Sequence, residues 1–256
     1  MLKIKFIGTG SAKVSLRRNF TSLLLDTEDE KILIDCGDGI SRALLQQNVE
    51  FNSINKILIT HLHSDHFSGL STLLTQFKLD ERTNPVEIIS CKENIPIIKN
   101  FLFNSFIIPE RINFEIRFVG FDFDEEFSLS DKLKFITRKN SHLYKYESYK
   151  NLYDLSLASP SFLFYYNGSK ILFSSDIGSW EDLFLFSPPI DILICEITHI
   201  EITVLKEVFK KLNPFKTYLI HIPDEKESEI ENFLNQNRND LGQIDLAADG
   251  QEILID

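Results

Sequence analysis

Short apolar runs and amphipathic segments alternate along the chain. Its first part contains four strand-like runs, LKIKFIG, TSLLLDT, KILIDCG and NKILIT, at residues 2–8, 21–27, 31–37 and 55–60. They are rich in β-branched and large apolar residues, which favour extended strands. The segment ISRALLQQ, at 40–47, instead carries apolar residues at helical spacing, so we expect a helix between the last two strands.

The same alternation continues to the end of the chain. Ser64 is the expected N-cap of a helix that runs through Leu70, Leu73 and Leu74. Further strands are predicted at VEIIS, NFEIRFV, LKFIT, FLFYY, ILFSS, DILICEI and TYLIHI, and further helices at KENIPIIKNFLFNSF, EITVLKEVFKKL and ESEIENFLNQN. Strands and helices in this order suit packed sheets flanked by helices.

The segment THLHSDHFSGL, at 60–70, places His61, His63, Asp65 and His66 within six positions at the end of an apolar run. In an extended chain, residues two apart point to the same side, so His61 and His63 are able to share one metal ion. Asp65 and His66 fall at the start of the predicted helix, from which their side chains reach a second ion. The alternative is that surface or core histidines gathered here by chance, which is improbable because polar residues seldom crowd the end of a buried strand.

Three more polar residues occupy the same kind of position. His142 follows the run LKFIT, Asp176 follows ILFSS, and His221 ends TYLI, so each lies where a predicted strand meets a loop. Taken singly, the histidines are more often structural and the aspartate more often a turn residue. Their shared position at strand ends, where proteins commonly build sites, favours a functional role.

In this order the residues resemble the metallo-β-lactamase superfamily, whose pattern is HxHxDH followed by a distant His, an Asp and a final His. The resemblance implies a single domain over 1–256 with a four-layer αββα sandwich of two mixed sheets flanked by helices. It implies two Zn²⁺ ions, with Mn²⁺ or Fe²⁺ as alternatives. The implied ligands are His61, His63 and His142 for one ion, Asp65, His66 and His221 for the other, and Asp176 as the bridge.

The flanking segments resemble the ribonuclease Z branch of that superfamily. The opening FIGTGSAKVSLRRNFTSLLLDTEDEKILIDCGDG carries a Gly-rich turn, an Arg-Asn pair and an Asp-Cys-Gly. The segment SPSFLFYYNGSKILFSSD is similar to the branch's strands before the bridging Asp, DILICEITH to its His-Glu-Ala-Thr segment, and AADGQEILI to its terminal hairpin. The resemblance covers nearly the whole chain.

The sequence departs from ribonuclease Z in two places. The long arm that holds transfer RNA is replaced by a short aromatic-rich link between His142 and Asp176. The histidine that the family uses as a proton donor is replaced by Cys195, which leaves Glu196 and His199 as candidates for that role. Both departures make the chain similar to compact phosphodiesterases of the branch, such as the cyclic-phosphate hydrolases of the carbon-phosphorus lyase pathway, although it lacks their cysteine-bound zinc.

The resemblance therefore implies a dinuclear metal-dependent hydrolase. We expect a phosphodiesterase that cleaves a small or cyclic phosphodiester through a metal-bridging hydroxide, with Asp65 in the catalytic centre and Asp35 holding a ligand histidine. One alternative is a ribonuclease Z-like RNA endonuclease, and another is a glyoxalase II-like thioester or lactone hydrolase, which lacks the GTGSA and Arg-Asn opening. A binding protein that keeps metal for structure alone is disfavoured because every ligand position is present.

Composition bears on the substrate and on the compartment. A net charge of −11 disfavours a large nucleic acid, because such binding depends on many Lys and Arg contacts to phosphates. The chain shows neither a signal peptide nor an apolar run of membrane-spanning length, so a cytoplasmic protein without membrane contact is expected. Cys36, Cys91 and Cys195 are far apart and are expected to be buried rather than bonded. A homodimer is common in this branch and is one expected assembly.

Two groups of residues near the expected site have two interpretations each. The basic residues form either a rim that holds phosphate or ordinary solvated surface. They are Lys13, Arg17, Arg18, Arg138, Lys139 and Lys145. Aromatic residues either stack on a nucleobase or sugar, or make packing or dimer contacts. They are Tyr144, Tyr146, Tyr149, Tyr153 and Trp180.

Overall fold

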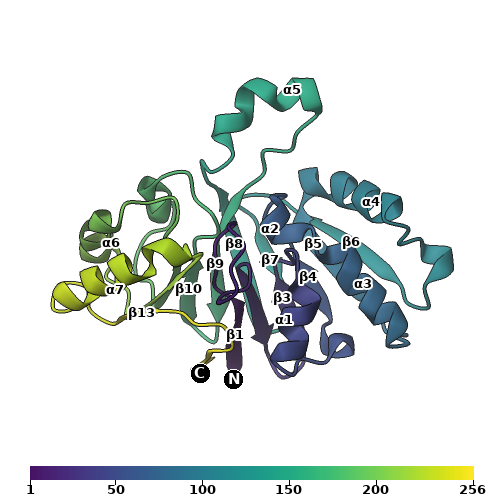
Figure 1. The fold of residues 1–256 in the computed structure, drawn as a ribbon, viewed down its shortest axis with the longest axis horizontal. Coiled ribbons are helices and arrows are strands. Elements are labelled where there is room, and N and C mark those ends of the chain that lie inside the picture. The colour runs from purple at the N-terminus through teal and green to yellow at the C-terminus, as the bar shows by residue number, and fades with distance from the viewer.

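The computed structural model describes all 256 residues as two seven-stranded sheets packed face to face, with helices on both outer sides (Figure 1). The first sheet has the order β14-β1-β2-β3-β4-β5-β6, with β1 at Leu2–Gly8, β2 at Ser22–Asp26, β3 at Lys31–Ile34, β4 at Lys56–Leu58, β5 at Val86–Cys91, β6 at Ile116–Phe121 and β14 at Glu252–Ile255. The second has the order β13-β12-β11-β10-β9-β8-β7, with β7 at Glu126–Ser128, β8 at Leu133–Lys139, β9 at Pro160–Tyr166, β10 at Ser169–Phe173, β11 at Ile192–Glu196, β12 at Lys216–Ile220 and β13 at Ile244–Leu246.

The α-helices divide between the two sheets. Against the first sheet pack α1 (Ile40–Gln46), α3 (Leu70–Leu79) and α4 (Ile95–Asn104), and against the second pack α6 (Leu205–Leu212) and α7 (Glu227–Gln236). Two shorter helices are α2 (Ser64–Phe67) and α5 (Lys150–Tyr153). The 3₁₀ helices are η1 (Phe51–Ser53), η2 (Lys92–Asn94), η3 (Pro109–Arg111), η4 (Tyr144–Tyr149), η5 (Trp180–Phe184), η6 (Ile202–Val204) and η7 (Asp224–Lys226). None of the helices has the length and apolar character needed to cross a membrane.

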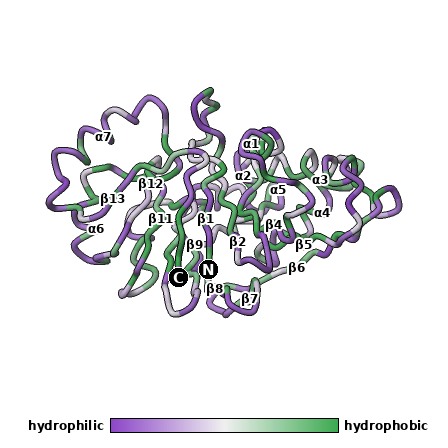
Figure 2. The backbone as a smooth tube through the Cα atoms, turned by 90° about the horizontal axis from the view of Figure 1, so that it is seen from below, coloured by the Kyte–Doolittle hydropathy of each residue, from purple (hydrophilic) through white to green (hydrophobic).

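Three buried apolar layers explain why these segments form strands. In β3, Ile32 and Ile34 point toward the other sheet, whereas Leu33 points toward the helices. Because both faces of the strand are covered, its residues are apolar from Ile32 to Ile34. The layer between the sheets contains 25 buried residues, and the outer layers contain 22 and 18. Figure 2 accordingly shows hydrophobic strands at the centre and hydrophilic stretches on the outer helices. The expected αββα sandwich is confirmed.

The parallel parts of the sheets place their strand ends at one edge of the sandwich. In the first sheet β3, β4 and β5 run parallel, and in the second β10, β11 and β12 do. Strand β8 runs in the same direction as β10, because β9 is antiparallel to both. All candidate ligands follow the ends of these strands. The segment with η4 and α5 stands above the same edge (Figure 1).

The predicted helix after Ser64 is wrong in detail. Its N-cap is His63, and the helix is divided into α2 and α3. The cause is the turn after β3, because the Cys36 amide donates to the His66 carbonyl and the Cys36 carbonyl accepts from the Gly69 amide. Those two groups are thereby taken from the helical ladder. The approach is so close that a Cβ on Gly69 would lie 2.1 Å from the Gly37 carbonyl oxygen.

The expected terminal hairpin is also wrong. Strand β13 pairs with β12 in the second sheet, whereas β14 pairs with β1 in the first, so the chain crosses between the sheets. Asp249 holds this crossing, because its carboxylate accepts hydrogen bonds from Thr9 and from both the backbone and the side chain of Asn19. Arg18, which precedes Asn19 in the chain, donates to the Ala247 carbonyl. The Arg-Asn pair of the opening segment is thus structural.

Candidate metal centre

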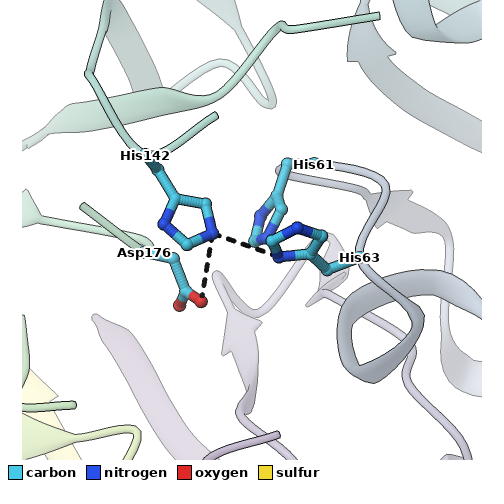
Figure 3. A group of neighbouring side chains, drawn as sticks. All are labelled: His61, His63, His142 and Asp176. Atoms are coloured by element: carbon cyan, nitrogen blue, oxygen red, sulfur yellow. Dashed lines mark hydrogen bonds and ion pairs between the residues drawn. The ribbon is translucent and has the colours of Figure 1, made fainter. Parts of the chain in front are cut away.

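The structure brings all seven predicted ligands together in two adjoining clusters. The first cluster consists of His61, His63, His142 and Asp176, and Figure 3 shows these side chains converging from different segments. The second cluster consists of Asp65, His66, Asp176 and His221. Within each, the atoms that could bind a metal lie within 4.8 Å of one another. Asp176 belongs to both clusters, which is the arrangement expected of a bridging carboxylate.

The strand ends turn sharply to present these residues. His61 and His63 lie in the irregular extended segment beyond β4, which ends at Leu58, two residues earlier than the predicted strand. At the other strand ends, Asp35 and His221 adopt φ values of 61° and 54° in the left-handed region. This conformation costs a non-glycine residue about 1–3 kcal/mol and is typical of functional sites.

The donor atoms fit metal ions. His61 and His66 each have a buried Nε2 without a hydrogen-bond partner, and leaving such an atom unsatisfied costs about 1–3 kcal/mol. The His66 nitrogen lies 3.3 Å from an Asp65 carboxylate oxygen without making a hydrogen bond. His142 Nε2 lies 3.1 Å from His63 Nδ1, so two ring nitrogens face each other. Cations between these groups would satisfy them all.

The outward nitrogens of four histidines are fixed by hydrogen bonds. The Thr60 hydroxyl donates to Asp35 Oδ2 at 2.9 Å, so it accepts from His61 Nδ1 at 3.0 Å. His66 Nδ1 lies 2.7 Å from the same Asp35 oxygen. Each histidine therefore keeps its proton on Nδ1 and presents Nε2 to the centre. Asp35 thus holds the ring of His66, a candidate ligand, while Thr60 was not predicted, although it directly precedes His61.

Histidines at the ends of strands in the second sheet are also held through Nδ1. The Thr198 hydroxyl donates to the His221 carbonyl and accepts from His221 Nδ1 at 3.0 Å. His142 Nδ1 donates to the Ile177 carbonyl at 3.3 Å. His221 Nε2 then lies 3.4 Å from carboxylate oxygens of both Asp65 and Asp176. The ring orientations are therefore set by the protein itself.

Burial and neighbouring charges set the protonation of the ligands. Burial lowers the pKa of His61 well below its usual value and that of His142 to about 3, which keeps both rings neutral as metal binding requires. Burial raises the pKa of Asp176, but His221 and His66 outweigh it and hold that pKa well below the ordinary value. For His66, burial lowers the pKa while the Asp176 and Asp35 carboxylates raise it, with a net increase.

Glu196 and His199 lie beside the clusters. The buried Glu196 carboxylate accepts from the backbone amides of Thr198 at 2.7 Å, His199 at 3.1 Å and Ile177 at 3.4 Å, and it lies 3.1 Å from His199 Nδ1. The His199 side chain is 28% exposed, with its ring 4.8 Å from that of His142. Burial lowers the pKa of His199, but the hydrogen bond and charge of Glu196, together with the charge of Asp176, raise it, with a net increase. Cys195 is buried in the core, as are the other two free cysteines.

The basic residues of the first loop are paired with carboxylates. Arg17 and Arg18 both contact Glu227, and Lys13 lies 3.2 Å from Glu225. These ion pairs neutralise the charge that a phosphate would need, so this part of the predicted rim is not a free anion site. Lys145 differs, because its ammonium lies 5.3 Å from the centroid of the Tyr146 ring and its charge contributes to lowering the pKa of His63, His142 and His199.

Comparisons with known proteins agree with the fold. The structure of the metallo-β-lactamase fold protein YhfI from Bacillus subtilis is similar, with a TM-score of 0.77, 15% identity and 98% of both chains covered. A diphosphatase of the PhnP family has a TM-score of 0.67 and 18% identity, with 100% of this chain and 98% of that one covered. A ribonuclease Z from Prochlorococcus marinus (strain AS9601) is 35% identical over 140 residues, which is 54% of this chain and 43% of that protein. The chain thus matches less than half the length of that relative.

The two sheets and the paired clusters define a metallo-β-lactamase-fold protein, and part of its sequence is similar to ribonuclease Z. A family model described as anti-Pycsar protein Apyc1 matches residues 2–237, which is most of the sequence. The chain belongs to that family.

Proposed function

We propose that the protein is a dinuclear metal-dependent phosphodiesterase that acts on a small or cyclic phosphodiester. The observation that carries this proposal is the sharing of Asp176 by two buried clusters whose histidines present Nε2 to a common centre. His61, His63, His142 and Asp176 would hold one ion, and the second cluster the other. Zinc, manganese or iron ions bound there would supply an activated water and neutralise charge on a phosphoryl oxygen.

The chain's own residues would position the substrate and handle the leaving-group proton. Lys145 would attract the phosphate, because its ammonium acts on three histidines of the site. His199 is the better candidate for proton donor, because it is partly exposed and its Nδ1 is held by Glu196. Glu196 is buried and already accepts several N–H groups, so its role would be to orient His199.

Several features favour a small substrate. The segment between His142 and Asp176 that carries η4 and α5 is short compared with an arm that grips RNA, and the net charge is −11. One structural neighbour is a diphosphatase, which favours a phosphorylated substrate for this fold. The family description leads us to infer that the protein acts against Pycsar, with hydrolysis of a small phosphodiester as the means.

Metal analysis and a substrate panel test the proposal. Purified protein should carry about two zinc, manganese or iron atoms per chain, as a dinuclear site requires. The panel contains a bis-aryl phosphodiester, cyclic nucleotides, a precursor transfer RNA, S-lactoylglutathione and a β-lactam. Turnover of the phosphodiester or a cyclic nucleotide that is lost in His63→Ala would support the proposal, whereas turnover of the thioester alone would refute it.

RNA cleavage is the second candidate, because the relative from Prochlorococcus is named ribonuclease Z. Precursor transfer RNA in the same panel separates the two functions. Efficient cleavage of that RNA, with the small diesters left intact, would replace our proposal by this one.

The role of His199 requires two leaving groups. We expect His199→Ala to slow a diester with an alkoxide leaving group by about a hundredfold, the usual size of general acid catalysis. A p-nitrophenolate leaving group needs no proton and should be much less affected. Thr203→Ala, at an exposed position nearby, is the control. An equal effect of His199→Ala on both substrates would assign His199 a structural role.

A further inference from the structure

Two loops of the second sheet each supply one side chain to the first cluster. The His142 loop, residues 140–143, follows β8, and the Asp176 loop, residues 174–179, follows β10. Strand β9 lies between β8 and β10, so the sheet separates these strand ends by about 10 Å, twice the spacing of neighbouring strands. Nevertheless, His142 Nε2 lies 3.7 Å from an Asp176 carboxylate oxygen, and Figure 3 shows the two side chains converging. Contacts between the loops therefore set the spacing of these two ligands.

Asp182, in η5, makes the central contact between the loops. Its Oδ2 accepts hydrogen bonds from the Gly178 amide at 3.0 Å and the Ser179 amide at 3.4 Å, at the end of the Asp176 loop. The same oxygen accepts from Ser141 twice, from the backbone amide at 3.1 Å and from the hydroxyl at 2.7 Å. Because Ser141 directly precedes His142, one carboxylate oxygen joins both loops. Such hydrogen bonds to a carboxylate are stronger than those between neutral groups.

Two further contacts fix the loops against each other. Asn140 Nδ2 donates to the Asp176 carbonyl at 2.9 Å, and Asn140 Oδ1 accepts from the His142 amide at 3.1 Å. The backbones also approach at Gly178, where a Cβ would lie 2.5 Å from the Ser141 carbonyl carbon. Only glycine permits so close an approach. The two loops therefore form one packed unit with Asp182 at its edge.

Capping of η5 does not account for all of these contacts. A cap needs only the amides of Gly178 and Ser179, whereas Ser141 lies 41 residues from Asp182 in the chain. The two clusters also depend on the loops to different degrees. The first cluster takes a ligand from each loop, whereas the second takes only Asp176 from them. A change in the link between the loops would therefore act mainly on the first cluster.

We propose that Asp182 is a positioning residue, which sets the spacing of His142 and Asp176 and thereby the affinity of the first cluster for its metal ion. Its hydrogen bonds go to Ser141, Gly178 and Ser179 and not to a ligand side chain, so it acts through the loops. This inference rests on the proposed function, because it takes the first cluster to bind a metal ion. It adds to that function the residue that controls the first site.

Titration of the metal-free protein with Co²⁺ tests the proposal. Native mass spectrometry counts the bound ions, and visible absorption follows each binding step. We expect Asp182→Ala to weaken one step by about 10–100-fold, as for partners that orient metal ligands, and to leave the other within about twofold. Ser141→Ala removes one hydrogen bond between the loops and should weaken the same step by less. Glu181→Ala, at an exposed position in the same 3₁₀ helix, is the matched control and should bind Co²⁺ like the wild type.

A double-mutant cycle separates positioning from a general structural role. In His142→Ala the spacing of the two ligands no longer matters, so adding Asp182→Ala should leave the weakened step unchanged. Gly178→Ala should separate the loops while Asp182 is retained, and should weaken the same step. Circular dichroism confirms that each variant is folded, and Ser141→Ala decides the question if Asp182→Ala does not fold. A full effect of Asp182→Ala in the His142→Ala background, or equal weakening of both steps, would overturn the inference.

Diester turnover, measured separately, distinguishes failure of this inference from failure of the proposed function. Co²⁺ binding that depends on Asp182 as described, without turnover of any diester, would refute the proposed function and support the inference. Turnover with Co²⁺ affinities that are unchanged in Asp182→Ala and Ser141→Ala would overturn the inference alone. A wild-type protein that binds no Co²⁺ would refute both.

Discussion

The two clusters share Asp176 but differ in their surroundings. Every residue of the second cluster is buried, and two of its histidines are held by Asp35 and Thr198. In the first cluster His61 and His142 are held in the same way, but His63 is half-buried and lies beside Tyr146. The two clusters therefore contain the same kinds of side chain but differ in how far these side chains are buried.

This difference indicates that the two clusters have different roles. In the second cluster, hydrogen bonds to Nδ1 of His66 and His221 leave each ring only one orientation. The first cluster keeps one ligand at the surface, where a substrate can approach. We infer that the second cluster mainly sets the geometry and stability of the centre, while the first cluster governs access.

The largest effect is expected for Asp176→Asn, which alters both clusters at once. An amide replaces the carboxylate that lies 3.4 Å from His66 Nε2 and His221 Nε2 and 3.7 Å from His142 Nε2. Loss of a hydrogen-bond partner behind a metal ligand typically lowers activity by about 10–100-fold. Diester turnover should fall by more than this in Asp176→Asn. Mass spectrometry of the native protein should show both metals lost. Glu181→Gln, an exposed position nearby, serves as control, and retention of one full metal equivalent in Asp176→Asn would contradict a shared ligand.

Histidine substitutions compare the two clusters directly. In the metal-free protein, His66→Ala should lower the free energy of unfolding by about 3–5 kcal/mol, because it leaves the buried Asp35 carboxylate without its charged partner. His63→Ala removes a half-buried ring and should cost about 1 kcal/mol or less. Urea unfolding with chelator present measures both values. Equal losses in the free energy of unfolding would refute the inference that the two clusters have different roles.

The strands could be predicted because they are buried on both faces, whereas the packing of the two sheets was implied only by the family resemblance. The runs at 32–34 and 57–59 are apolar throughout, and strands covered on two sides require that pattern. The cluster from His61 to His66 was recognisable for a related reason, because strand ends in apolar surroundings rarely carry several His and Asp residues by chance, whereas His142, Asp176 and His221 were assigned to the same site through the family resemblance. These signals are local in sequence, so one chain suffices to detect them.

Other features depend on contacts between distant segments. The division between α2 and α3 results from backbone groups of Cys36, about thirty residues away in the chain. The crossing to β14 depends on Asp249 meeting Asn19. Thr60 and Thr198 have ordinary sequence surroundings, and only the folded structure places their hydroxyls beside ligand rings.

Asp35→Asn tests how far the second cluster depends on the residues behind it. In the wild type, His66 Nδ1 carries a proton that it donates to Asp35. Asparagine keeps an oxygen for the Thr60 amide but turns an N–H group toward this nitrogen. The ring would then move its proton to Nε2 and lose the lone pair that faces the centre. We expect metal affinity to fall about 10–100-fold. Competition with a chromophoric chelator measures the affinity, and Asp38→Asn, an exposed aspartate three residues away, should leave it unchanged.

The smallest effect is expected for Thr198→Val, which removes the hydroxyl that accepts from His221 Nδ1 while keeping the volume of the side chain. The ring stays in place through packing and loses only its anchor, so metal affinity should fall about tenfold, at the low end for such partners. Loss of the two hydrogen bonds of this hydroxyl, to the His221 ring and to the His221 carbonyl, should cost about 1–3 kcal/mol in stability. Thr203→Val, an exposed threonine five residues away, provides the control in the same competition and urea experiments. A metal affinity of Thr198→Val equal to that of the wild type would mean that this hydroxyl does not orient His221.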